Sequence, residues 1–360
     1  MRALCLLATL AVAGAQELLF AYHGGELYAH LKNQFEDRGD HMLYFLYLVR
    51  HRAKDVSANM AHLAGDNWAD TVDFALWRGP GMKLPRLLPD HDWTGWATAW
   101  IPPHDAIADV FTQEHVDWRH RNNNVYWTGA FSGGDVRKEF ANCEHKYKNT
   151  FEADVKDWHV LRDAPPLPFT KDLLKPAVAD LRHLTFHKYL IYLRGNSWSS
   201  SIKRILAAGA AVFLPTEVEH ETMLDFVLRE CDDCFYHYSQ RDVCGSIARV
   251  FQNATDEEAH AKAWRLKKFV AEHLTLDKML DLATEQINSL AAARPLGPVR
   301  VEGDVLTLED GTALTRQTCA GLKEAHKSHI LAGLHWQVDA WFDAECRPMA
   351  HAPYLSYVAL

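Results

Sequence analysis

The sequence has 360 residues, enough for two domains with separate cores, and its 48% hydrophobic and 24% charged residues are typical of a folded globular protein. The formal net charge of −9 shows no excess of basic residues, which argues against a nucleic-acid partner. One cysteine, Cys5, lies near the N-terminus, and the others can pair as disulfides in an oxidising compartment. We expect Cys231-Asp-Asp-Cys234 to form a structural bridge, because no second C-x-x-C is present to complete a zinc site.

Residues 1–15 have the pattern of a secretory signal peptide. Arg2 precedes an apolar run over residues 3–12, and Ala13-Gly14-Ala15 offers small residues for cleavage before Gln16. No later run is long enough to span a bilayer, so we expect no transmembrane segment and a location in the secretory-pathway lumen (endoplasmic reticulum or Golgi) or outside the cell. The sequon at Asn253 is the candidate glycosylation site.

The first half of the chain alternates strand and helix patterns. The predicted elements are a hairpin of residues 18–22 and 26–31, a helix over 41–52, strands over 70–77, 97–101 and 125–130, and a helix over 135–146. The proline-rich stretch before residue 103 is interpreted as a long surface loop with only the strand over 97–101 in it, so the D-x-D pair Asp90 and Asp92 is expected to be solvated acid rather than a metal site. Residues 163–168 contain three prolines in four residues and are the predicted linker.

The second half opens with the segment that is richest in groups able to bind a ligand. An apolar strand over residues 188–193, a glycine turn, a helix and a second apolar run over 210–214 predict a βαβ unit with parallel strands. The turn brings backbone N–H groups and serine hydroxyls to the carboxyl edge of the sheet, and Lys203 and Arg204 follow one helical turn later. These groups can hold phosphates, although the segment is neither a Walker A loop nor G-x-G-x-x-G and many α/β units bind no phosphate.

The rest of the chain is predicted to be mainly helical. It comprises a helix over residues 219–228, a short strand over 235–238, three helices up to 292, a hairpin over 299–308 and a helix over 319–331.

The residues of the βαβ unit resemble a known family motif. The run from Arg194-Gly195-Asn196 to Lys203-Arg204, with the later His237-Tyr238 and residues 253–259, resembles the core motif of glycosyltransferase family 90, which includes Rumi-type protein O-glucosyltransferases and fungal capsule-associated xylosyltransferases. The resemblance covers about residues 181–290 and is fainter upstream, at residues 125–129. It implies an α/β GT-B-like fold, with two Rossmann-like domains and a cleft between them. It also implies a UDP-sugar co-substrate and no requirement for a metal or other cofactor.

The resemblance also implies a division of the chain and a set of site residues. The domains would be an acceptor-side domain at 16–164, a nucleotide-sugar-binding domain at 165–295 and a C-terminal extension, a hairpin plus a helix, at 296–360. The expected donor-binding residues are Arg194, Gly195, Asn196, Ser197, Trp198, Ser199, Ser200, Lys203 and Arg204. The candidate cleft residues are Tyr126, Trp127, Thr128 and Gly129.

Three positions depart from the family pattern. Ser201 and Thr128 stand where relatives usually carry Arg, and residues 76–80 lack the acid expected there as a base. The catalytic base is therefore unassigned, with Asp73, Asp90 and Asp92 as weak candidates. One hypothesis is an inverting transferase that moves glucose or xylose from a UDP-sugar to a hydroxyl of a protein or glycan acceptor. The other is a catalytically weak relative that binds sugar or protein.

Overall fold

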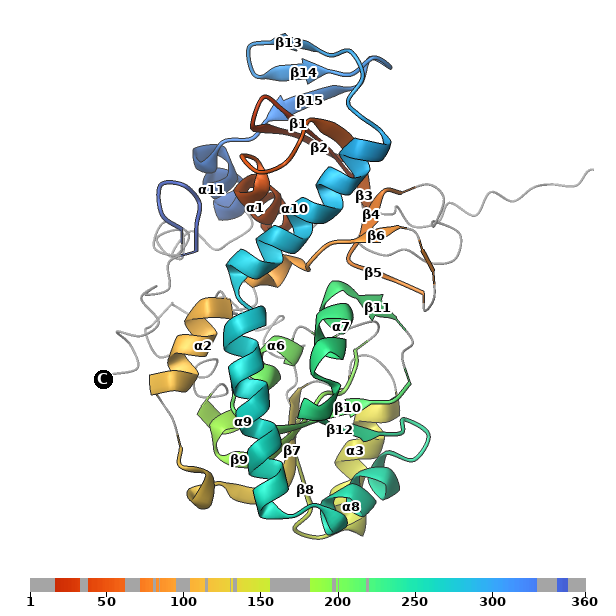
Figure 1. Cartoon of the computed structure of the whole chain (residues 1–360), viewed down its shortest axis with the longest axis vertical. Coiled ribbons are helices and arrows are strands. Elements are labelled where there is room, and N and C mark those ends of the chain that lie inside the picture. The colour runs from red at the N-terminus through yellow and green to blue at the C-terminus, as the bar shows by residue number, and fades with distance from the viewer. Residues whose placement is uncertain are drawn as a thin grey trace, which may run out of the picture.

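The computed structural model divides the chain between two main sheets that lie one above the other (Figure 1). It describes residues 17–32, 38–61, 72–79, 82–83, 85–94, 104–113, 116–129, 131, 135–155, 182–195, 199, 201–217, 220–328 and 342–348. The predicted signal peptide, the linker at 163–168 and the predicted strand at 97–101 lie outside these residues.

The N-terminal domain is built on an eight-stranded mixed sheet with the order β13-β14-β15-β2-β1-β3-β4-β6. Its strands are β1 (Glu17–His23), β2 (Glu26–Lys32), β3 (Val56–Ala61), β4 (Phe74–Ala75), β6 (Arg86–Leu87), β13 (Arg300–Glu302), β14 (Val305–Thr307) and β15 (Ala313–Arg316). Gly24 and Gly25 both have positive φ at the β1–β2 turn, which confirms the predicted hairpin. The helices α1 (Arg38–Val49), α10 (Leu276–Ala293) and α11 (Cys319–Ser328) complete this domain.

The C-terminal domain is built on a five-stranded parallel sheet with the order β12-β10-β9-β7-β8. Its strands are β7 (Asn122–Gly129), β8 (Phe151–Val155), β9 (His187–Ile191), β10 (Ala211–Pro215) and β12 (Phe235–Tyr238). Its helices are α3 (Asp135–Lys146), α6 (Ser201–Ala207), α7 (Met223–Leu228), α8 (Val243–Asn253) and α9 (Asp256–His273). The chain order reverses between β7 and β9, and such switch points at the carboxyl ends of strands are where open α/β sheets bind ligands.

The GT-B-like fold class and the βαβ unit β9–α6–β10 are confirmed. The sheet membership, however, differs from the predicted division at residue 164. Strands β7 and β8 pair with β9 rather than with the N-terminal strands, and β15 of the supposed extension pairs with β2. The N-terminal sheet is also mixed rather than Rossmann-like, since β1 is antiparallel to both its neighbours. An apolar pattern identifies a strand but does not say which sheet it joins.

The proline-rich stretch is not a surface loop where the structure describes it. Leu88 is 0% and Trp93 2% exposed, and the short helix η1 (His91–Thr94) packs against α1 and α2 (His104–Gln113). The predicted strand over 70–77 is divided into β4 and β5 (Trp77–Arg78). Tryptophan and leucine side chains between the prolines fill the core here. The prolines favoured a surface loop, so their spacing did not predict this burial.

A strand pair and a helix crossing are among the contacts that join the domains. Strand β5 pairs antiparallel with β11 (Glu221–Thr222), which leads into α7. Helix α9 of the C-terminal domain is followed directly by α10, which packs against α1 and β3 of the N-terminal domain (Figure 1). A strand pair and a helix crossing therefore both join the two domains.

The six cysteines in the described residues form three disulfides, as expected from the sequence. Cys143–Cys244 joins α3 to α8, and Cys231–Cys234 lies within η5 (Arg229–Cys234). The third disulfide, Cys319–Cys346, joins the first residue of α11 to Cys346. In the described part of the chain, Cys231, Asp233 and Cys234 form the one group with metal-ligand spacing, but the disulfide uses both sulfur atoms. Asn253, the predicted glycosylation site, is exposed at the last residue of α8.

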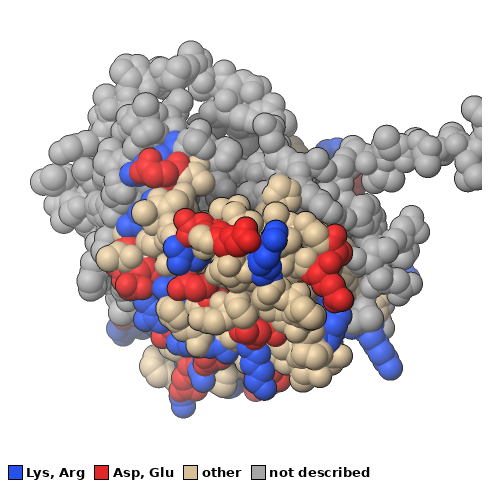
Figure 2. Space-filling view, turned by 90° about the horizontal axis from the view of Figure 1, so that it is seen from above, with Lys and Arg blue, Asp and Glu red and all other residues tan. Residues whose placement is uncertain are grey.

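The described surface has mixed charge. On the face in Figure 2, acidic and basic side chains are interspersed, and no broad basic area is seen among the coloured residues. Among the described helices, none combines the length and the apolar character needed to cross a membrane.

Candidate donor-binding site

A cavity of about 340 Å³ lies between the two domains. The C-terminal domain lines it with residues that follow β9 and β10 and with residues of α7, η5 and β12. The N-terminal domain contributes Leu76, Leu88, Pro89, Asp90 and Trp93. The cavity thus opens at the carboxyl edge of the parallel sheet, which is the edge predicted from the sequence.

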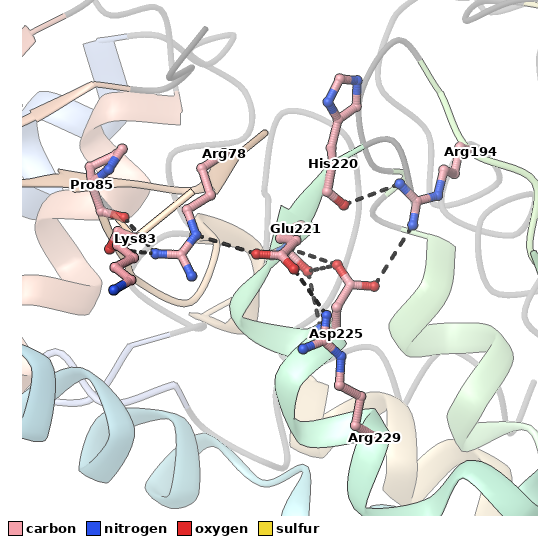
Figure 3. Close-up of polar contacts among 9 residues, drawn as sticks. Arg78, Lys83, Pro85, Arg194, His220, Glu221, Asp225 and Arg229 are labelled. Carbon is pink, nitrogen blue, oxygen red and sulfur yellow. Dashed lines mark hydrogen bonds and ion pairs between the residues drawn. The ribbon is translucent and has the colours of Figure 1, made fainter. Parts of the chain in front are cut away.

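Arg194 is the cation that the turn after β9 brings to this cavity. It is 8% exposed, and its Nη1 donates to the carbonyl oxygen of His220 at 3.1 Å (Figure 3). Its Nη2 lies 3.9 Å from the Asp225 carboxylate, and its buried Nε has no hydrogen-bond partner among the described residues. A buried guanidinium with an unused N–H donor can bind a further anionic ligand, and arginine commonly binds phosphates in this way.

Asp225 is held in place by the start of α7. Its carboxylate accepts hydrogen bonds from the backbone N–H of Thr222 at 2.7 Å and from the Thr222 hydroxyl at 2.8 Å, while the Asp225 N–H donates to that hydroxyl. This capping box fixes one carboxylate oxygen and leaves the other directed toward Arg194. The sequence analysis did not select Asp225, although T-x-x-D is a helix-start pattern that could have marked its position.

Glu221 joins the two domains beside the cavity (Figure 3). Its carboxylate lies 3.4 Å from Arg78 Nε of the N-terminal domain and accepts from Arg229 Nη2 at 3.0 Å. Arg78 also donates to the carbonyl groups of Lys83 and Pro85 at 2.9 and 3.1 Å. Arg229 itself lines the cavity and is about half exposed, so it offers a second cation there.

Asp90 faces the cavity from the N-terminal domain and is not the solvated acid that its loop predicted. Its side chain is 12% exposed and accepts a hydrogen bond from Lys203 Nζ at 2.5 Å. Lys203 is 3% exposed and lies over the Trp93 ring, and burial lowers the pKa of its ammonium to about 8 despite the nearby Asp90. Lys203 therefore supports Asp90 and does not line the cavity, contrary to the expectation that it meets the donor phosphates.

The other expected donor residues are divided between described and undescribed parts of the chain. Gly195 follows Arg194, the backbone N–H of Ser199 donates to the Tyr192 hydroxyl at 2.9 Å, and Arg204 lies half-buried on α6 beyond the cavity lining. Four lie outside the described residues, namely Asn196, Ser197, Trp198 and Ser200.

The candidate cleft residues on β7 are mainly core residues. Tyr126 and Trp127 are each 2% exposed, and the Tyr126 ring stacks on His187 at 4.0 Å. Thr128 and Gly129 are half-buried at the carboxyl end of the strand. None of the four lines the cavity, so the prediction of a cleft surface on β7 is not supported there.

Of the candidate bases, Asp90 is the one that the structure places at the cavity. Asp73 instead accepts from Arg294 at 2.6 Å and from the backbone N–H of Asn59 at 2.9 Å, and it does not line the cavity. The side chain of Asp92 lies outside the described residues.

Arg194, the parallel sheet and all the cavity-lining residues except Leu76 lie within the part of the chain that matches a known family. The family described as Glycosyl transferase family 90 matches residues 77–305, more than half of the chain. The chain belongs to this family. The match begins at β5 and ends in β14, so it includes the whole C-terminal sheet, and it supports a glycosyltransferase function.

Two solved structures are distantly similar. One is an α,α-trehalose 6-phosphate synthase from Burkholderia multivorans, with 11% identity and a TM-score of 0.35 over 55% of this chain and 51% of that one. The other is an α,α-trehalose-phosphate synthase (UDP-forming) from Burkholderia vietnamiensis, with 11% identity and a TM-score of 0.34 over 55% and 52%. This chain spans about half the length of each. No curated protein matches it.

Proposed function

We propose that this family member is an inverting glycosyltransferase that moves glucose or xylose from a UDP-sugar to a hydroxyl of a protein or glycan acceptor. The observation that carries the proposal is the buried Arg194 guanidinium at the interdomain cavity, with its Nε unpaired among the described residues. A diphosphate is the anionic group of a nucleotide sugar, and it would accept hydrogen bonds from Arg194. Arg229 would add charge at the same cavity.

The two sides of the cavity suit a direct displacement. The acceptor oxygen attacks the anomeric carbon, the bond to the diphosphate breaks with its electron pair, and a base takes the acceptor proton. Asp90 is the base in this proposal, because it lines the cavity from the N-terminal domain while Arg194 lines it from the C-terminal domain. Lys203 holds its carboxylate in place, and Arg194 stabilises the charge of the departing UDP.

The proposed location is the lumen of the secretory pathway or the outside of the cell, with no metal or other cofactor required and glycan on Asn253. Three disulfides and an exposed Asn253 support this location. The alternative is a weakly active relative that binds sugar or protein. It is favoured by Ser201 and Thr128, which stand where relatives usually carry Arg.

Calorimetric titration with UDP, UDP-glucose and UDP-xylose tests the proposal, with ADP and GDP as competitors. The Arg194→Met variant should bind UDP roughly 10- to 100-fold more weakly, since a charge-assisted hydrogen bond contributes about 1.5–3 kcal/mol. Arg249→Met is the matched control, because Arg249 is exposed on α8, forms an ion pair with Asp242 and does not line the cavity. Equal UDP affinity in wild type and Arg194→Met would contradict the placement of the donor. Tight binding without turnover would favour the alternative function.

A further inference from the structure

Side chains from two other elements hold the backbone that carries Arg194. Beyond the last residue of β9, the carbonyl oxygen of Tyr192 accepts from the Tyr238 hydroxyl at 2.9 Å. The next two carbonyl oxygens, of Leu193 and Arg194, accept from Arg137 Nη2 at 3.3 Å and from Arg137 Nε at 2.9 Å. Three consecutive carbonyl groups are therefore fixed by hydrogen bonds at the carboxyl edge of the sheet.

Arg137 reaches this position from the first turn of α3, the helix between β7 and β8. It is 6% exposed, and its Cζ lies 5.8 Å from the centre of the Trp127 ring on β7. It thus joins the end of β9 to β7 and α3, across the point where the strand order reverses. A planar guanidinium can donate to two neighbouring carbonyls at once, which a lysine ammonium at the same place does with poorer geometry.

We propose that Arg137 is a positioning residue for the Arg194 guanidinium. The inference depends on the proposed function, in which Arg194 binds the donor diphosphate. Arg137 holds the carbonyl group of the same residue whose side chain enters the cavity. Fixing that peptide unit fixes the point from which the Arg194 side chain extends, and small displacements of a binding group are costly in affinity.

The first experiment compares a ligand that has the diphosphate with one that lacks it. In Arg137→Met, UDP affinity should fall about 10-fold, as expected for one weakened charge-assisted contact, while uridine affinity measured by ligand-observed NMR stays unchanged. Arg137→Lys keeps the charge but has a single donor nitrogen, so its loss should be smaller. Arg249→Met should match wild type for both ligands. Equal losses for UDP and uridine would overturn the inference in favour of general destabilisation.

A double-mutant cycle tests whether Arg137 acts through Arg194. If it does, Arg137→Met should cause no further loss of UDP affinity in the Arg194→Met background. Additive losses would mean that Arg137 contributes to UDP binding independently, which contradicts a positioning role.

Hydrogen exchange tests the inference even if UDP does not bind, and such a failure would contradict the proposed function alone. In the free protein, Arg137→Lys and Arg137→Met should increase deuterium uptake in the peptide over residues 192–201 relative to Arg249→Met. Arg137→Lys covers the case in which Arg137→Met fails to fold. Unchanged uptake in a folded Arg137 variant would overturn the inference.

Discussion

The cavity brings together Asp90 from one domain and Arg194 from the other. Asp90 and Arg194 are both largely buried, and both line the space between the domains. Each is also supported from behind, Asp90 by Lys203 and the Arg194 backbone by Arg137. Charged groups that are held in place before the substrate arrives need little reorganisation during the reaction.

Asp90→Asn should separate catalysis from donor binding. The amide cannot accept a proton, so turnover should fall about 100-fold or more, as is usual when a general base is removed, while UDP affinity stays within about threefold. Turnover is measured as UDP release from the preferred donor with acceptor present. Asp73→Asn is the matched control, since Asp73 pairs with Arg294 away from the cavity. Unchanged turnover in Asp90→Asn would show that another group is the base.

The sequence predicted that Arg194 lies at the sheet edge, where it lines the cavity, but did not predict its supporting residues. The motif after β9 marks a turn at a sheet edge, and this position predicts phosphate binding. Lys203 and Arg204 seemed equally available there, yet α6 directs Lys203 into the interior, where it meets Asp90. Arg137 and Asp225 are distant in sequence from this turn, so only the fold reveals that they support it.

At the scale of elements, local patterns were the reliable signal. Helix α3, strand β12 and the hairpin β13–β14 form where the local pattern of residues predicted them. The sheet partners of β7 and β15 were not predictable, because pairing depends on contacts between residues far apart in the chain. Helix α2 was missed because the prolines before it favoured a loop, although its apolar face packs against α6.

Helix α2 carries a histidine that should make stability depend on pH. His104 is 1% exposed and packs edge-on against Trp93, with ring centroids 4.7 Å apart. Burial lowers its pKa from 6.5 to about 4, despite the nearby Asp90. Between these values the unfolded chain binds a proton that the folded protein does not, so the free energy of unfolding falls as the pH falls through this window.

Urea unfolding at pH 7 and pH 5 measures this contribution. His104→Phe keeps an aromatic ring against Trp93 but cannot titrate. On going from pH 7 to pH 5, its free energy of unfolding should therefore fall by about 2 kcal/mol less than that of wild type. His30→Gln, at an exposed position on β2, serves as the control and should follow wild type. The same pH dependence in His104→Phe and wild type would show that other groups account for the acid sensitivity.

For the whole molecule, the domains are joined by contacts beside the cavity. The β5–β11 pair crosses the cleft, and Glu221 lies between Arg78 of one domain and Arg229 of the other. The Trp77 and His220 rings, 4.1 Å apart, extend this contact. Because β11 continues into α7, this strand pair is directly connected to Asp225 and to the wall of the cavity.

Glu221→Gln should therefore weaken the junction without disturbing either sheet. The Glu221 and Arg78 side chains are 11% and 13% exposed, so removing the carboxylate leaves a largely buried guanidinium without its counter-charge, at a cost of about 3 kcal/mol in unfolding free energy. Small-angle scattering should show a larger radius of gyration for the ligand-free variant, which UDP partly reverses. Glu302→Gln removes an exposed partner of Arg300, where both side chains are 71% exposed, and should change stability by less than about 1 kcal/mol and leave the scattering unchanged. If Glu221→Gln behaves like Glu302→Gln in both measurements, the Glu221 contact does not hold the domains together. The domains are then held by α9–α10 and the rest of the interface.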